Sequence, residues 1–269
     1  MKRIFTVLII GFVVACTNSA EKTNNAQGAN QEEVKNEEVL TDAQKLVVSI
    51  EEAHRKNLFA ANEAIQFELN LQFGGKEKLN GRIYLLTDGS KVKIEDAFGL
   101  KYWDGERAMV LTNTENNDDA RFDLLTWSYF FTAPYKLNDP GVKQKFQGKR
   151  RLGDSEFEAN RMTFEKGIGD TPDDWYIVYK DRDSDLLAAM AYIVTSGGTN
   201  VEEAEKDHHV ITYEGYTAVG GVPFATQWNF WTWNEEGEMN KLLGSATVSN
   251  IEFIKKAGDM FNLTASSDY

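Results

Sequence analysis

Apolar and polar residues alternate without exception along residues 65–73. The apolar positions are Ile65, Phe67, Leu69, Leu71 and Phe73. Because successive side chains of a strand point to opposite faces, this period predicts a strand with one buried and one wet face. Gly74-Gly75 ends it, and Asp88-Gly89 separates two further apolar segments, so we expect an antiparallel meander.

The densest apolar material lies in residues 161–195, which predicts three strands joined by two polar turns. In the second of these strands, alternate residues beginning at Trp175 share one face, and those beginning at Tyr176 share the other. Residues 187–194 are apolar almost without interruption, which is typical of a central strand. We therefore expect this part of the sheet to be covered on both faces.

Two other segments have helical spacing. Thr41 and Gln44 fit a capping box that begins an amphipathic helix, expected at residues 42–57. The segment FDLLTWSYFF at residues 122–131 is apolar on nearly every side. Such a helix must be buried or must fill a cavity. We expect Pro134 and the Asp139-Pro140-Gly141 turn to end it.

These elements predict an α+β protein. We expect a strongly curved antiparallel sheet, an incomplete β-barrel of about ten or eleven strands, with helices packed on its concave face. Residues 41–269 contain neither a repeat nor a break in composition, so we expect them to form a single domain.

The N-terminus predicts export. Lys2 and Arg3 precede an apolar run at residues 4–15, too short to cross a bilayer, for which a helix needs about 20 residues. This pattern is typical of a signal peptide. Val13-Val14-Ala15-Cys16 resembles the lipobox of bacterial lipoproteins, in which the cysteine carries the lipid. The alternative is a plain signal peptide with an incidental cysteine.

Cys16 is the only cysteine of the chain, so an internal disulfide and a thiolate metal site are both excluded. Thr17 follows it. By resemblance to the sorting rules of enteric bacteria, a threonine there favours the outer membrane, and we expect the periplasmic leaflet. Residues 16–40 are polar and lack aromatic residues, which predicts a flexible tether behind the lipid anchor.

The amino-acid composition restricts the classes of partner that the protein can bind. The 269 residues carry a net charge of −13, which argues against nucleic acid or an anionic membrane surface as a direct partner. The chain contains 6 Trp, 10 Tyr and 16 Phe residues, ample for one sizeable core.

Three groups of polar residues are candidates for a catalytic or metal site. Asp170, Asp173 and Asp174 could supply a general acid and base, as in glycoside hydrolysis, or could cap backbone amides of their loop. The capping interpretation is favoured. No nucleophile elbow or phosphate-binding glycine loop is present.

The remaining groups concern metals. The aspartates of residues 181–185 are spaced like the start of a calcium loop, but Leu186 stands where that loop needs glycine. A hydrated hairpin turn is the simpler interpretation. His208 and His209 would point to opposite faces of a strand, and His54 is the only other histidine. We expect no metal site and no cofactor.

The aromatic strand at residues 224–233 has two interpretations. Its aromatic side chains either fill the core on both faces or line an apolar cavity between the sheet and the helix at 122–131. In the second case the candidate ligand-binding residues are Phe122, Leu125, Trp127, Tyr129, Phe130, Trp175, Trp228, Phe230, Trp231 and Trp233.

Four segments resemble a family of uncharacterised exported lipoproteins, classed as a domain of unknown function. They are AHRKNLFAANEAIQFELNLQFGGKEKLNG, TWSYFFTAPYKLNDPG, MTFEKGIGDTPDDWYIVYKDRDSDLLAAMAYIVT and GVPFATQWNFWTW. More distantly, the element order is similar to the LolA/LolB-like superfamily of periplasmic lipoprotein carriers and outer-membrane receptors. That superfamily shelters acyl chains in an incomplete barrel. No diagnostic residue of the carrier maps onto this sequence, so its activity is not carried over.

The sequence therefore favours a membrane-anchored lipoprotein that binds a lipid or another hydrophobic ligand without catalysis. Two alternatives stay open: a hydrolase-type envelope enzyme that uses the Asp170–Asp174 loop, and an interaction scaffold that pairs through an exposed strand edge. The sequence does not indicate an oligomeric state.

Overall fold

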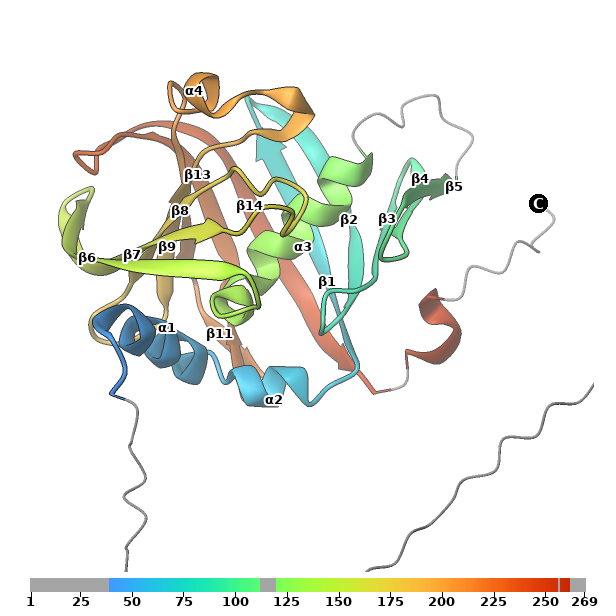
Figure 1. Cartoon of the computed structure of the whole chain (residues 1–269). Coiled ribbons are helices and arrows are strands. Elements are labelled where there is room, and N and C mark those ends of the chain that lie inside the picture. The colour runs from blue at the N-terminus through green and yellow to red at the C-terminus, as the bar shows by residue number, and fades with distance from the viewer. Residues whose placement is uncertain (1–38, 112–119, 256, 262–269) are drawn as a thin grey trace, which may run out of the picture. The chain divides into compact units, whose positions relative to one another are not determined.

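The computed structural model describes residues 39–111, 120–255 and 257–261, and the chain from Leu40 onward forms one compact unit (Figure 1). The expected signal peptide, Cys16 and most of the expected tether lie outside these residues. Among the helices of the described part, none is long and apolar enough to cross a membrane.

One antiparallel sheet of twelve strands dominates the unit, in the order β5-β4-β3-β2-β1-β14-β13-β10-β9-β8-β7-β6, and β11 pairs with β12 separately. The strands of the large sheet are β1 (Ala64–Phe73), β2 (Lys76–Leu86), β3 (Val92–Asp96), β4 (Gly99–Trp103), β5 (Ala108–Leu111), β6 (Val142–Leu152), β7 (Ser155–Phe164), β8 (Tyr176–Lys180), β9 (Leu187–Tyr192), β10 (His209–Glu214), β13 (Gln227–Trp233) and β14 (Met239–Ile254). The small ribbon consists of β11 (Thr217–Val219) and β12 (Val222–Phe224).

The antiparallel sheet is confirmed, and within the described residues β5 and β6 are its two open edges. It has more strands than the ten or eleven expected. The aromatic segment at 224–233 divides into β12 and β13, and the short strand β4 has no clean alternation that would reveal it. The long strand β14 lies in the interior of the sheet, between β1 and β13.

The two faces of the sheet bury different side chains. The alternation in β1 is confirmed, because Ile65, Phe67, Leu69 and Leu71 are each 0% exposed. Trp175, Ile177 and Tyr179 belong to one apolar cluster, and Tyr176 and Val178 to another. This part of the sheet is therefore covered on both sides, as predicted.

The first helix is shorter than expected. α1 (Asp42–Ala53) begins with the predicted capping box of Thr41 and Gln44. It ends before His54 because Arg55 takes a left-handed φ of 55°, and α2 (Lys56–Ala60) then starts in a new direction. This turn allows both His54 and Phe59 to be buried.

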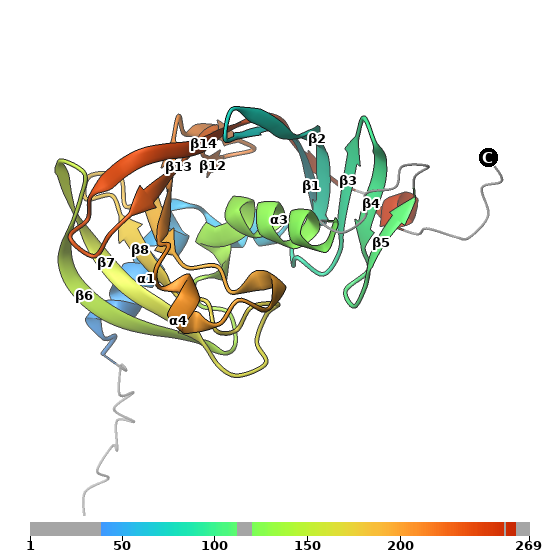
Figure 2. The same ribbon diagram turned by 90° about the horizontal axis from the view of Figure 1, so that it is seen from above.

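The apolar helix is longer than expected. α3 (Ala120–Lys136) continues through Pro134, which was predicted to end it. Figure 2 shows the sheet curving around α3, and buried side chains of α1, α2 and α3 belong to the same apolar cluster. The short helix α4 (Val201–Ala204), capped by Asn200, packs in the cluster of the opposite face instead. Two 3-10 turns, Ser196–Gly198 and Gly258–Phe261, complete the described structure.

Candidate functional site

The interior side of α3 meets the sheet through aromatic rings. Phe131 stacks on Phe67 of β1 with 3.9 Å between ring centroids, and Phe130 lies 5.2 Å from the ring of Tyr192 in β9. Trp127 approaches Phe230 of β13 edge-on at 6.1 Å. β1 lies on one side of β14 in the sheet, and β9 and β13 lie on the other. α3 therefore contacts both halves of one curved sheet.

The hydroxyl groups of Ser128 and Thr132 in α3 are bonded within the helix. Ser128 donates to the carbonyl of Leu124 at 2.6 Å, and Thr132 donates to the carbonyl of Ser128 at 2.7 Å. Such bonds to the preceding turn satisfy hydroxyl groups that would otherwise need partners in the sheet. The middle of α3 therefore presents an almost wholly apolar surface, although it contains serine and threonine.

Polar contacts fix the N-terminal end of α3 to its neighbours. Asp123 pairs with Lys101 of β4 and accepts a hydrogen bond from the indole nitrogen of Trp127 at 3.0 Å. Arg121 pairs with Asp170 and lies over the ring of Trp103, 4.7 Å from its centre. We call the Lys101–Asp123 and Arg121–Asp170 pairs the α3 latch.

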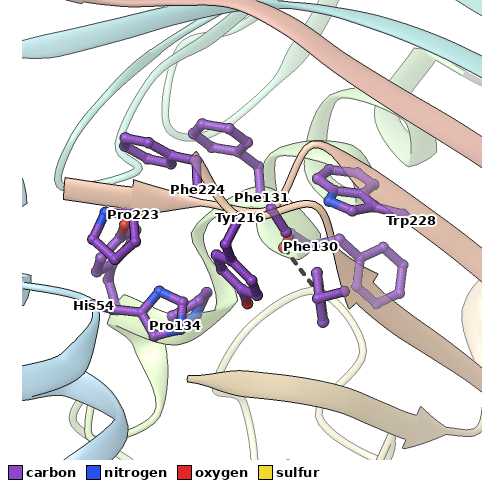
Figure 3. Close-up of a pocket in the computed structure, with 11 residues that line it drawn as sticks. His54, Phe130, Phe131, Pro134, Tyr216, Pro223, Phe224 and Trp228 are labelled. Carbon is purple, nitrogen blue, oxygen red and sulfur yellow. Dashed lines mark hydrogen bonds between the residues drawn. The ribbon is translucent and has the colours of Figure 1, made fainter. Parts of the chain in front are cut away.

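The other end of α3 borders a small cavity, shown in Figure 3. Its volume of about 10 Å³ accommodates roughly one water molecule. The space is far smaller than the ligand-sized hollow expected from the sequence, because the rings of α3 and the sheet fill the region between them. Its lining residues are His54, Phe130, Phe131, Pro134, Tyr135, Tyr213, Tyr216, Pro223, Phe224, Ala225 and Trp228.

Four polar side chains line this cavity, and two of them lack complete hydrogen bonding. Tyr213 donates to the carbonyl of Phe130 at 3.1 Å, and Tyr216 donates to the carbonyl of Leu187 at 2.7 Å. The hydroxyl group of Tyr135 is buried and makes no hydrogen bond of normal geometry. Nδ1 of His54 is also buried, and its contact with the carbonyl oxygen of Pro223 falls outside normal hydrogen-bond geometry. Burial raises the pKa of Tyr135 well above its ordinary value.

His54 is held as a neutral ring. Its Nε2 accepts a hydrogen bond from the backbone N–H of Leu187 at 3.0 Å, so the proton of the neutral imidazole is on Nδ1. Burial lowers its pKa from 6.5 to about 3, and the carbonyl of Pro223 opposes that shift. This role was not predicted from the sequence, although His54 follows Ile50 by four residues and so continues the apolar side of the first helix.

No family model and no curated protein matches this chain. Its structure is similar to that of a LolA superfamily protein from Nitrosomonas europaea, with a TM-score of 0.51 and 10% identity over 82% of this chain and 98% of the other. The two chains share a fold. A DUF1329 family protein from Desulfovibrio piger has a TM-score of 0.49 and 13% identity, over 82% of this chain and 97% of the other. A putative outer membrane lipoprotein-sorting protein domain from Vibrio parahaemolyticus has a TM-score of 0.40 and 9% identity, over 79% of this chain and 93% of the other.

The LolA-like sheet divides the predicted ligand-binding residues between its two faces. Those in the cluster that contains α3 are Trp127, Tyr129, Phe130, Trp228 and Phe230. Trp175, Trp231 and Trp233 lie in the cluster of the opposite face. Phe122 is 40% exposed at the start of α3, and Leu125 is half-buried. Of the ten, only Phe130 and Trp228 line the cavity.

The three aspartates of the predicted acidic loop have different surroundings. Asp174 is buried and accepts hydrogen bonds from the backbone N–H and hydroxyl of Thr195 and from the hydroxyl of Thr171. Burial raises its pKa. Asp170 pairs with Arg121, and Asp173 is exposed. These contacts agree with the loop-capping interpretation.

The other two polar groups are structural. Asp181 accepts hydrogen bonds from the backbone of Asp183 and Ser184, as in a tight hairpin turn. The ring of His208 contacts Trp175 and Trp233, whereas that of His209 stacks on Tyr192, so the two rings face opposite sides of the sheet. Among the described residues, no cluster of three or more His, Cys, Asp or Glu residues is arranged to hold a metal ion.

Proposed function

We propose that this protein is a membrane-anchored envelope lipoprotein that binds a lipid or another hydrophobic molecule between α3 and its LolA-like sheet, without catalysis. The observation that carries the proposal is the construction of α3. The middle of this helix meets the sheet through apolar rings, its Ser128 and Thr132 hydroxyl groups are satisfied within the helix, and its ion pairs lie towards its two ends.

Binding requires α3 to move outward, because the present cavity of about 10 Å³ cannot contain an acyl chain. Apolar contacts have no directional requirement, so an acyl chain can replace ring contacts of α3. The hydrogen bond from Tyr213 to the carbonyl of Phe130 has to break or move with the helix. Each buried methylene contributes about 0.8 kcal/mol, so a chain of about twelve contributes roughly 10 kcal/mol before ordering costs. The half-buried pair Lys101–Asp123 opposes this by only about 1–3 kcal/mol, and the exposed pair Arg121–Asp170 by about 0–1 kcal/mol.

The proposed location follows from the sequence. Cys16 would carry the lipid anchor, the polar segment at 16–40 would serve as the tether, and Thr17 favours the outer membrane facing the periplasm. The net charge of −13 is consistent with a unit held away from anionic lipid surfaces.

Native mass spectrometry of the full-length chain with Cys16→Ser tests this proposal, because the substitution removes the predicted anchor lipid. We expect a fraction of the protein to retain one co-purified lipid. Trp228→Phe should reduce that fraction, and Trp233→Phe is the matched control, since this tryptophan is buried in the same strand on the opposite face. Bare protein in several independent preparations would contradict the proposal.

A further inference from the structure

The cavity beside α3 combines an apolar wall with two incompletely bonded polar atoms. His54 is 1% exposed and Tyr135 is 4% exposed, and both border the cavity, which has room for about one water molecule. Their rings lie edge to face, with centroids 6.0 Å apart. A buried polar atom without a hydrogen bond costs free energy, so one group that bonds to both side chains would stabilise the site.

The chemistry of the two side chains limits that group. Since Nε2 of His54 accepts from Leu187, its Nδ1 is a donor. The hydroxyl group of Tyr135 can donate or accept. An oxygen atom that accepts from Nδ1 and exchanges a hydrogen bond with the Tyr135 hydroxyl therefore satisfies both.

We propose that His54 and Tyr135 form a specificity site for a neutral oxygen, the ester carbonyl or hydroxyl group at the polar end of the hydrophobic ligand. This inference rests on the proposed function. The cavity is continuous with the α3 interface, because Phe130, Phe131 and Trp228 line it. An acyl chain that replaces ring contacts of α3 can thus place its first oxygen against His54.

An ionised carboxylate does not fit this site. The titratable groups that line the cavity are His54 and the phenols Tyr135, Tyr213 and Tyr216, all of which are neutral near pH 7. Burial raises the pKa of Tyr216, and the negative charge of Asp181 adds to that shift, so the site disfavours an anion. A buried carboxylate would meet no cation among these groups, and an unpaired buried charge is strongly destabilising.

The test compares methyl oleate with oleate near pH 7, bound to the full-length Cys16→Ser chain and measured by displacement of the dye N-phenyl-1-naphthylamine. We expect methyl oleate to bind at least about ten times more tightly than oleate. Tyr135→Phe should weaken methyl oleate binding about threefold to tenfold, the equivalent of one lost hydrogen bond. The same variant should leave the thermal stability unchanged or raised, because it removes an unpaired hydroxyl group.

Tyr179→Phe is the matched control. Its hydroxyl group is also buried and makes no hydrogen bond of normal geometry, but its ring lies in the cluster of the opposite face, so methyl oleate binding should not change. If methyl oleate binds the parent chain and Tyr135→Phe equally, or if oleate binds as tightly, the specificity site is wrong while the proposed function stands. If neither ligand displaces the dye from the parent chain, both proposals fail.

Discussion

The hydroxyl group of Tyr213 in β10 donates a hydrogen bond of 3.1 Å to the carbonyl oxygen of Phe130 in α3. That carbonyl lies four residues before Pro134, whose nitrogen has no proton to donate. A side chain of the sheet therefore supplies the donor that the helix lacks. This contact explains how α3 continues through a proline, and it ties the helix to the sheet at the cavity (Figure 3).

Tyr213→Phe should reduce the free energy of unfolding by about 1–3 kcal/mol, because it leaves the buried Phe130 carbonyl without a donor. Pro134→Ala supplies a backbone N–H to the same carbonyl. In the Pro134→Ala background, the cost of Tyr213→Phe should therefore fall well below its value in the parent chain. Urea unfolding of the four proteins measures this coupling, and equal costs in both backgrounds would refute the explanation.

The stability of the protein should decrease as the pH falls below neutral because of His54. Its folded pKa of about 3 lies below the ordinary value of 6.5, so the unfolded chain binds the proton first. The contribution is complete above about pH 6.5 and is lost progressively towards pH 3. Between about pH 7 and pH 5.5 the loss should be about 1 kcal/mol.

His54→Gln is the variant that checks this attribution. The glutamine oxygen can still accept a hydrogen bond from the backbone N–H of Leu187, but the side chain does not titrate. Urea unfolding at the two pH values should show that most of the difference has disappeared. An unchanged pH dependence in this variant would assign the effect to other groups.

The α3 latch should control how easily the helix leaves the sheet. Asp123→Asn removes the charge that faces Lys101 but keeps an oxygen to accept from Trp127. We expect faster hydrogen exchange in α3 and faster uptake of a hydrophobic dye, with about 1–3 kcal/mol less stability. Arg82→Gln breaks an exposed pair with Glu68 on the surface and is the control. Identical exchange in α3 for both variants would mean that the latch does not hold the helix.

Replacing the acidic loop residues separates capping from catalysis. Asp174→Asn turns one carboxylate oxygen into a donor that faces the hydroxyl or backbone donors of Thr171 and Thr195, so stability should fall by about 1–3 kcal/mol. Asp173→Asn, at an exposed position, should change stability by less than about 0.5 kcal/mol. Thermal unfolding provides the comparison. An Asp174→Asn protein of unaltered stability would reopen the enzymatic interpretation.

Local patterns predicted much of this fold. The alternation from Ile65 to Phe73 identified the buried face of β1, and the capping box at Thr41 identified the start of α1. The assignment of Trp228 and Trp233 to opposite faces also followed from the period of a strand. Each of these features depends on residues that are close together in the sequence.

The features that could not be predicted depend on contacts between residues that are far apart in the sequence. Pro134 lies inside α3, where Tyr213 of β10 supplies the donor that the Phe130 carbonyl lacks. The pairing of β1 with β14 joins segments from opposite ends of the unit, and no local pattern specifies it. The size of the cavity depends on how the rings of α3 and the sheet pack, which composition does not reveal. Of the ten predicted ligand-binding residues, therefore, only those on the face of the sheet that contacts α3 remain in the candidate site.

Photo-crosslinking with a diazirine analogue of methyl oleate tests the central claim most directly. The full-length Cys16→Ser chain is irradiated with the analogue, and labelled peptides are located by mass spectrometry. We expect labels on α3 residues 127–131 and on Trp228 or Phe230, and we expect excess methyl oleate to suppress them. Labels confined to Trp175, Trp231 and Trp233, or labels that excess methyl oleate does not suppress, would contradict the central claim.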